Sequence, residues 1–178
     1  LAPLVASDAV AGRLTPAAAA ELGLPAGTPV AAGLSDTAAC LLGMGQLTPG
    51  ATVLQVGSGI QIMSVVDRVT PAVQPFYNSY RGVGGSLYAM AALQNGGTVF
   101  EWVRGVLGAS WPEMYAAAFE TGAETGEIVF LPYVTGERAP LLDPGASAAW
   151  AFLRLGATRA QMIRAVFEGV ALAVRDAW

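Results

Sequence analysis

The pattern of hydrophobic and polar positions alternates between the period of a helix and that of a strand. Helical spacing of apolar residues, bounded by capping residues or glycines, predicts helices over 16–22, 35–43, 100–107 and 111–121, and another from residue 158 onward. Short runs rich in apolar, aromatic or β-branched residues predict strands over 30–32, 51–56, 60–66, 76–80, 86–93 and 128–131. Residues 132–157 are predicted to be mostly irregular. Mixed α/β is the fold class that follows.

The ends of two predicted elements carry specific signals. Thr15 precedes a proline and four alanines, and Gly23 follows the helical run, so Thr15 is the expected N-cap and Gly23 the expected terminator. Ser35 or Asp36 is the expected cap of the next helix. Both 30–32 and 128–131 are expected to be buried strands.

Composition narrows the function classes. Of the 178 residues, 54% are hydrophobic and 12% are charged, and the net charge is −4, so the chain offers no basic face for nucleic acid. Its apolar runs are short and interrupted, which gives no sign of a membrane span. There is no histidine and one cysteine, Cys40, which we expect to be a small buried hydrophobe. Cysteine–histidine catalysis is excluded, and a cytoplasmic location fits this cysteine usage.

Asp36 is the first candidate for chemistry. A carboxylate at a helix N-terminus is stabilised by the helix dipole and can accept the proton of an alcohol that attacks a phosphoryl group. The same residue type in the same place is commonly only a helix cap. Local sequence leaves both interpretations open.

Two glycine-containing turns are the other candidates. Gly57, Ser58 and Gly59 separate the two runs of a predicted hairpin, and glycines there would let backbone amides approach phosphate oxygens. The segment 95–97 enters a helix and could admit a nucleotide at its N-terminus. A plain turn or loop is the commoner case for both segments, and no Walker-type phosphate loop is present in the sequence.

The order of these features resembles the FGGY carbohydrate kinases, and most closely the xylulokinases. Blocks similar to that family lie at 12–15, 23–30, 32–39, 130–133 and 136–140. The spaced second FGGY signature can be followed through Ala148, Trp150, Leu153, Gln161, Met162 and 165–168. Phe152 departs from it, because the signature has glycine at that position.

The resemblance implies roles for individual residues. Asp36 falls on the catalytic aspartate that deprotonates the sugar hydroxyl, and Thr37 on a neighbour that contacts the sugar. Gly57, Ser58 and Gly59 fall on the loop that faces the terminal phosphates of ATP, and Gly97 on a glycine of the nucleotide pocket. Glu137 and Arg138 are expected to be structural. No residue of this chain falls on a metal ligand.

The resemblance also implies the architecture: part of the actin-like ATPase (ribonuclease H-like) fold, in which two α/β lobes hold Mg2+–ATP and a sugar. Residues 1–39 are expected to be the end of the N-terminal lobe and 40–178 the first part of the C-terminal nucleotide-binding lobe. The chain lacks an initiating methionine and is expected to be an excerpt, inactive by itself.

The implied reaction is ATP-dependent phosphorylation of a sugar hydroxyl, with D-xylulose as the first candidate substrate. Ribulose, sedoheptulose, glycerol and gluconate remain alternatives, since kinases for them share the same catalytic parts. A sensing relative without catalysis and a purely structural α/β module are the rival classes. The expected partners are a small sugar, ATP and Mg2+, with a homodimer as a further possibility.

Overall fold

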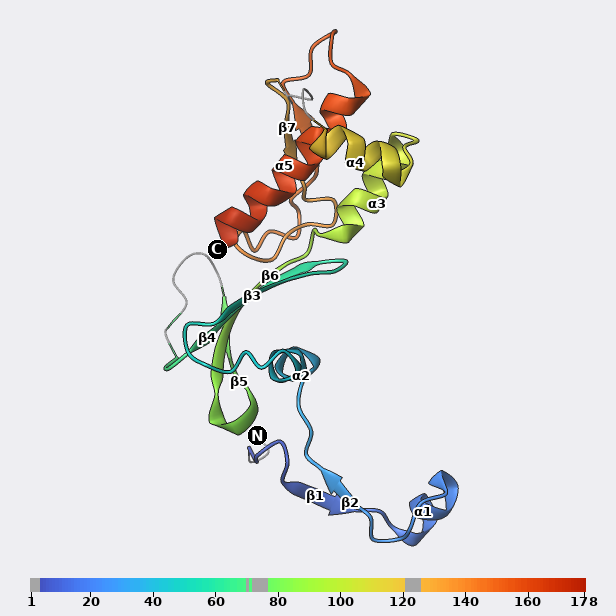
Figure 1. The fold of residues 1–178 in the computed structure, drawn as a ribbon, viewed down its shortest axis with the longest axis vertical. Helices are drawn as coiled ribbons and strands as arrows, with labels where there is room; N and C mark the ends of the chain where they lie inside the picture. The colour runs from blue at the N-terminus through green and yellow to red at the C-terminus, as the bar shows by residue number, and fades with distance from the viewer. Residues whose placement is uncertain (1–3, 70, 72–76, 121–125) are drawn as a thin grey trace. The chain divides into compact units, whose positions relative to one another are not determined.

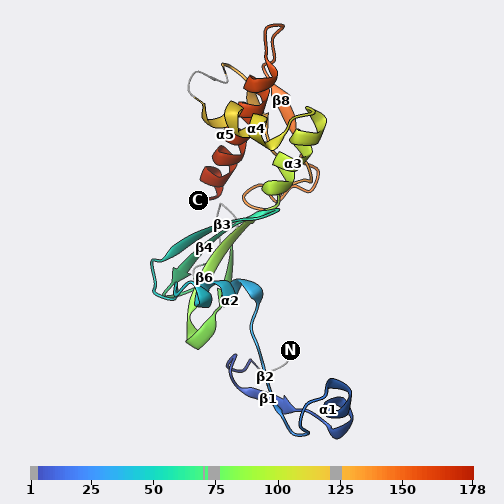
Figure 2. The same ribbon diagram turned by 45° about the vertical axis from the view of Figure 1, so that its right-hand side comes forward.

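The computed structural model describes residues 4–69, 71, 77–120 and 126–178, and it contains both helices and strands, as predicted. The chain divides into two compact units, which we describe separately. Unit 1 comprises 1–51, 64–69 and 79–88, and unit 2 comprises 52–63, 70–78 and 89–178. Figures 1 and 2 show the elements within each unit.

Unit 1 begins with an antiparallel strand pair. Strand β1 (Val10–Arg13) pairs with β2 (Pro29–Ala31), and helix α1 (Pro16–Leu22) lies between them in the chain. The α1 helix confirms the predicted signals, since the Thr15 hydroxyl accepts from the Ala18 amide and Gly23 ends the helix at φ 65°. The expectation of a buried strand at 30–32 was wrong: all of β2 is exposed, because its pair with β1 forms a sheet of only two strands. Strand β1 was not predicted.

Helix α2 (Asp36–Gly43) follows in unit 1. Ser35 is its N-cap, and the Ser35 hydroxyl accepts from the Ala38 amide at 3.3 Å. The buried face of α2 carries Thr37, Ala38 and Leu41. Cys40 is half-buried rather than fully buried.

A four-stranded sheet has the order β3 (Thr52–Val56), β4 (Ile60–Val66), β6 (Leu87–Leu93) and β5 (Asn78–Arg81). The neighbouring strands β3 and β4 confirm the predicted hairpin around residues 57–59. The predicted strand at 76–80 corresponds to β5, although residue 76 lies outside the described residues. A short 3-10 turn, η1 (Val83–Gly85), precedes β6.

The largest hydrophobic cluster lies in unit 2. It is built on β4 and β6 and on helices α3 (Gly97–Val106), α4 (Trp111–Phe119) and α5 (Arg159–Ala177). Strand β7 (Val129–Leu131) pairs antiparallel with β8 (Ala149–Ala151), a strand inside the stretch predicted to be irregular. Of the predicted strand 128–131, Ile128 and Phe130 are buried while Val129 and Leu131 are exposed, so the expectation of a buried strand holds for one face only.

Helix α5 packs on β7 and on α4, and a small residue allows its close contact with β7. It contacts both elements and begins with a capping box between Thr158 and Gln161. A side chain at Gly169 would collide with the carbonyl oxygen of Phe130. Glycine is therefore what lets the helix lie directly on the strand.

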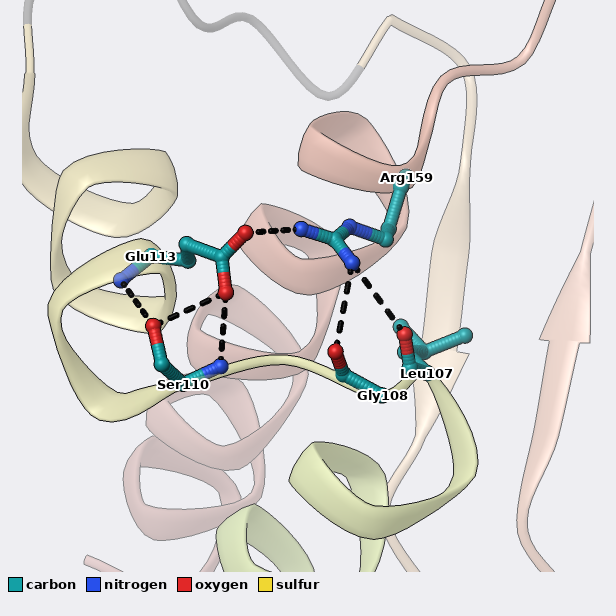
Figure 3. Close-up of polar contacts among 5 residues, drawn as sticks. All are labelled: Leu107, Gly108, Ser110, Glu113 and Arg159. Atoms are coloured by element: carbon teal, nitrogen blue, oxygen red, sulfur yellow. Dashed lines mark hydrogen bonds and ion pairs between the residues drawn. The ribbon is translucent and has the colours of Figure 1, made fainter.

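The start of α5 is tied to the corner between α3 and α4 by Arg159. Its guanidinium pairs with the Glu113 carboxylate and donates to the carbonyl oxygens of Leu107 and Gly108 at 3.4 and 3.3 Å (Figure 3). The Ser110 amide and hydroxyl donate to the same carboxylate, and together with Arg159 they lower the pKa of Glu113 to about 2.

Phe152 occupies a left-handed backbone position. Its φ is 62° and its side chain is 68% exposed. Glycine adopts this conformation without the steric cost that a Cβ brings. The structure thus gives a physical reason for the glycine of the FGGY signature at this position.

Among the helices of the described ranges, none combines the length and the apolar character that crossing a bilayer requires.

Candidate active site

Asp36 is the first residue of α2 and is exposed. Its Oδ1 accepts from the Thr37 amide at 2.7 Å and lies 3.4 Å from the Thr37 hydroxyl. The alternative that Asp36 caps the helix was wrong, because Ser35 takes that position. The start of the helix therefore orients the Asp36 carboxylate, and the carboxylate does not serve as the N-cap.

Thr37 is only 7% exposed, so its side chain belongs to the buried face of α2. The two hydrogen bonds to Asp36 give it the means to hold the carboxylate in one orientation. A pocket of about 590 Å³ in unit 1 is lined by Leu34 and Ser35, immediately before Asp36, and also by Asp8 and Arg81.

The other predicted site residues lie in unit 2, around the turn between β3 and β4. The turn is narrow, since the Gly57 amide donates to the Gly59 carbonyl at 2.8 Å. Ser58 is exposed at its tip, and its hydroxyl has no hydrogen-bond partner among the described residues. A hydroxyl in this state is available to a ligand.

The turn lies on the N-terminus of α3. The Gly97 amide donates to the Gly57 carbonyl at 2.7 Å, and the amides of Gly96 and Thr98 donate to the Ser58 carbonyl at 3.1 and 3.2 Å. These three amides therefore donate to the hairpin and are not available to bind an anion. The structure brings Gly57, Ser58, Gly59 and Gly97 together, and their binding of ATP stays a prediction.

Glycines make this contact possible. A Cβ on Gly97 would lie 2.7 Å from the Gly57 carbonyl oxygen, and one on Gly59 would lie 2.7 Å from the Leu93 carbonyl oxygen. Such distances are shorter than side chains tolerate. Gly97 thus supports the site by letting the backbone of the helix approach the turn.

An aromatic pocket adjoins the turn. It has a volume of about 600 Å³ and is lined by Gly57, Ser58, Gly97, Thr98, Glu101 and Trp102. Trp102 is 42% exposed and stacks on Trp150, with ring centroids 6.0 Å apart. Glu101 forms an ion pair with Arg104, which offsets its charge. The size and the exposed indole suit the planar base of a nucleotide.

A buried polar network holds the residues that immediately precede α3. Glu137 is 3% exposed, and its Oε1 accepts from the amides of Gln94 and Arg138 at 2.6 and 2.7 Å. Asn95, 1% exposed, donates from Nδ2 to Glu137 Oε2 at 2.9 Å and to the Gly136 carbonyl at 2.6 Å. This explains the structural role expected of Glu137. The contact joins residues 42 apart, and no local pattern marks it.

The residues of this region fit a nucleotide better than they fit a metal ion. Within the described ranges, no group of three or more acidic or cysteine side chains is placed to hold a metal. The turn offers a hydroxyl donor and the pocket offers an aromatic surface, which are partners for phosphate and base.

Comparison with known proteins places this geometry in a family. Residues 55–178 match the C-terminal domain of the FGGY family of carbohydrate kinases. The chain is 30% identical over 172 residues to a xylulose kinase of Klebsiella pneumoniae and 27% identical over 184 residues to a gluconokinase of Bacillus licheniformis. These alignments cover 94% and 96% of this chain, and 35% and 36% of the two relatives.

The fold is similar as well. The ligand-bound xylulose kinase from Lactobacillus acidophilus superposes with a TM-score of 0.85 at 27% identity, over 97% of this chain and 36% of that one. The chain thus spans about a third of the length of the curated relatives it matches. Its architecture is part of the actin-like ATPase fold of such kinases. The match over most of its length shows that this chain belongs to the FGGY family of carbohydrate kinases.

Proposed function

We propose that the full-length protein transfers the terminal phosphoryl group of ATP to a sugar hydroxyl, with D-xylulose as the first candidate acceptor. The observation that carries the proposal is the Ser58 turn, whose unpartnered hydroxyl lies between glycines on the N-terminus of α3, in a chain that also has an exposed, oriented Asp36. Residues 1–39 and 40–178 would contribute to the first and second lobes, respectively.

Asp36 acts as the base in this proposal. Its carboxylate accepts the proton of the sugar hydroxyl while the hydroxyl oxygen forms a bond to the γ-phosphorus. The bond from that phosphorus to the bridging oxygen breaks, and ADP leaves. Thr37 keeps the carboxylate oriented through its amide, so the base is preorganised.

Ser58 and Gly97 serve the nucleotide. The Ser58 hydroxyl donates to a phosphate oxygen, and Gly57 and Gly59 keep the turn narrow enough to present it. Gly97 allows the close approach of α3, and Trp102 lies against the base in the adjoining pocket. Mg2+, which FGGY kinases generally use with ATP, would be held through the phosphates, since the described residues supply no ligand cluster.

Gluconate is the second candidate acceptor, because the Bacillus licheniformis relative is a gluconokinase at similar identity. Ribulose, sedoheptulose and glycerol complete the set of alternatives. A sensor that binds a sugar or nucleotide without turnover is less well supported, since both Asp36 and the Ser58 hydroxyl are retained. We expect the enzyme to work in the cytoplasm, and a homodimer would be revealed by light scattering of the full-length protein.

The test is product analysis with the full-length protein, ATP and a panel of ketoses, polyols and gluconate. One phosphorylated product is expected, and Asp36→Asn should lower kcat about a hundred- to ten-thousandfold while leaving the Kd for ATP within about twofold. A wild-type protein that phosphorylates none of the panel, or an Asp36→Asn variant with near-normal kcat, contradicts the proposal.

A further inference from the structure

Ser58 lines a second pocket of unit 2 in addition to the aromatic pocket. The mechanism proposed above assigns no role to this second pocket. This pocket has a volume of about 330 Å³ and is lined by the turn, by the end of β6 and by Arg138. Its lining contains three glutamines and no acidic residue, so Arg138 is the only charged side chain among the lining residues. The residues that line the pocket therefore carry one positive charge, that of Arg138.

The Arg138 side chain is exposed and unpaired. No ion pair or hydrogen bond joins its guanidinium to any residue in the described ranges. The neighbouring acid, Glu137, is engaged by the amides of Gln94 and Arg138 and by the Asn95 side chain. All the N–H donors of the guanidinium are thus available to a ligand.

The backbone of Arg138 is held firmly beside the pocket. Its amide donates to the buried Glu137 carboxylate at 2.7 Å, and the next amide, that of Ala139, donates to the Ala92 carbonyl at 3.1 Å. Ala92 lies at the end of β6 and lines the same pocket. Arg138 is therefore presented to this pocket by hydrogen bonds on both sides of its Cα.

The combination of a fixed arginine and a glycine-flanked hydroxyl is suited to phosphate. Guanidinium binds phosphate oxygens in a bidentate manner, and charge-assisted hydrogen bonds are the strongest available to the side chain. Ser58 lines both this pocket and the aromatic pocket beside Trp102, so a nucleotide whose base lies in the aromatic pocket could extend its phosphates past Ser58.

We propose that Arg138 binds the terminal phosphate groups of the nucleotide beside the Ser58 hydroxyl. The inference rests on the proposed function for the identity of the ligand. It assigns Arg138 a binding role in place of the structural one that the sequence suggested. The structural role passes to Glu137, which holds the arginine's own amide.

The test is isothermal titration of the full-length protein with ATP and with adenosine, in the absence of any sugar. Arg138→Gln should raise the Kd for ATP about ten- to a hundredfold and leave the Kd for adenosine within about twofold. Arg138→Lys should bind ATP with intermediate strength, because it keeps the charge and loses the bidentate geometry. Arg154→Gln is the matched control. Arg154 is an exposed arginine of the same unit that lies outside this pocket, so the variant should bind ATP like the wild type.

Three results would overturn the inference. They are an unchanged Kd for ATP in Arg138→Gln, an equal loss for ATP and adenosine, and a lysine variant no better than the glutamine variant. Because the readout is binding alone, a selective loss of ATP affinity supports the Arg138 role even if the wild type phosphorylates no sugar. A wild type that turns over normally, with an Arg138→Gln variant of unchanged affinity, defeats this inference and leaves the proposed function standing. A wild type that binds no ATP defeats both.

Discussion

The two units hold their candidate residues in different ways. In unit 1, Asp36 depends on a single capped helix: Ser35 starts α2, and the Thr37 amide orients the carboxylate. In unit 2, backbone hydrogen bonds join the Ser58 turn to α3, and glycines leave room for this contact. The buried Asn95–Glu137 network holds the residues just before α3. The base thus depends on local structure, whereas the nucleotide turn depends on packing between segments distant in sequence. Damage to packing in unit 2 should therefore affect stability and nucleotide binding together, while damage to α2 should affect catalysis without affecting nucleotide binding.

The largest effect on stability is expected at Gly169. Gly169→Ala would push α5 away from the Phe130 carbonyl and destabilise the protein by about 1–3 kcal/mol, because neither helix nor strand can move without disturbing the core. Urea unfolding of the variant and of the wild type measures this loss of stability. Gly105→Ala is the matched control, since a Cβ there meets nothing within 4 Å, and it should be neutral or stabilising. Equal stability of the two variants would contradict the packing of α5 on β7.

A smaller effect is expected from the cap of α2. Ser35→Ala should cost about 1 kcal/mol of local helix stability and lower kcat in the full-length enzyme, with the Kd for ATP unchanged. Thr15→Ala removes the equivalent cap of α1, which carries no candidate residue, and should leave kcat unchanged. If Ser35→Ala raises the Kd for ATP by the same factor by which it lowers kcat, Asp36 and the nucleotide turn do not respond independently.

An increase in stability is expected at Phe152. Phe152→Gly should raise the free energy of unfolding by about 1 kcal/mol, because glycine removes the cost of φ 62° and the ring is largely exposed. Phe152→Ala, which removes the ring and keeps the Cβ, is the control and should not stabilise. Unfolding in urea distinguishes them, and a gain in both variants would point to the ring rather than to the backbone.

The smallest effect is a pH dependence at Glu113. Its pKa is lowered to about 2 from a usual value near 4.5, first by the Ser110 amide and hydroxyl and then by Arg159. The stabilisation is therefore present in full above pH 4.5 and is lost as the pH falls toward 2. Urea unfolding at pH 5 and pH 3 should show a loss that is smaller in Glu113→Gln. An identical loss in the variant would mean that other carboxylates account for it.

Features set by local sequence could be predicted, whereas features set by contacts between distant segments could not. Helix α1 was predicted with its cap and terminator because Thr15, the following proline and Gly23 are local signals. The resemblance, rather than any local pattern, brought Ser58 and Gly97 into one site. Strands β1 and β8 were missed, since each is three or four residues long and depends on a partner distant in the chain.

The amides of Gly96 and Gly97 are a second feature that local sequence could not predict. A glycine-rich helix start suggests a free anion site, but whether its amides are free depends on what packs there, and here it is the 57–59 turn. The Asn95–Glu137 contact was unpredictable for the same reason. The acid next to Arg138, Glu137, is engaged in this contact and with the Arg138 amide.

The Asn95–Glu137 contact restricts how this sequence can diverge. Both Glu137 oxygens accept, and both groups of Asn95 are engaged, with its oxygen 3.4 Å from the Thr135 amide and its nitrogen donating to Gly136 and Glu137. A glutamine at position 137 would set its NH2 group either against the NH2 group of Asn95 or against the backbone amides of Gln94 and Arg138. Turning the Asn95 amide over to relieve the first clash would oppose its oxygen to the Gly136 carbonyl. A tolerated replacement at either position therefore requires a compensating one at the other, so the two should be inherited as a pair across descendants of this sequence.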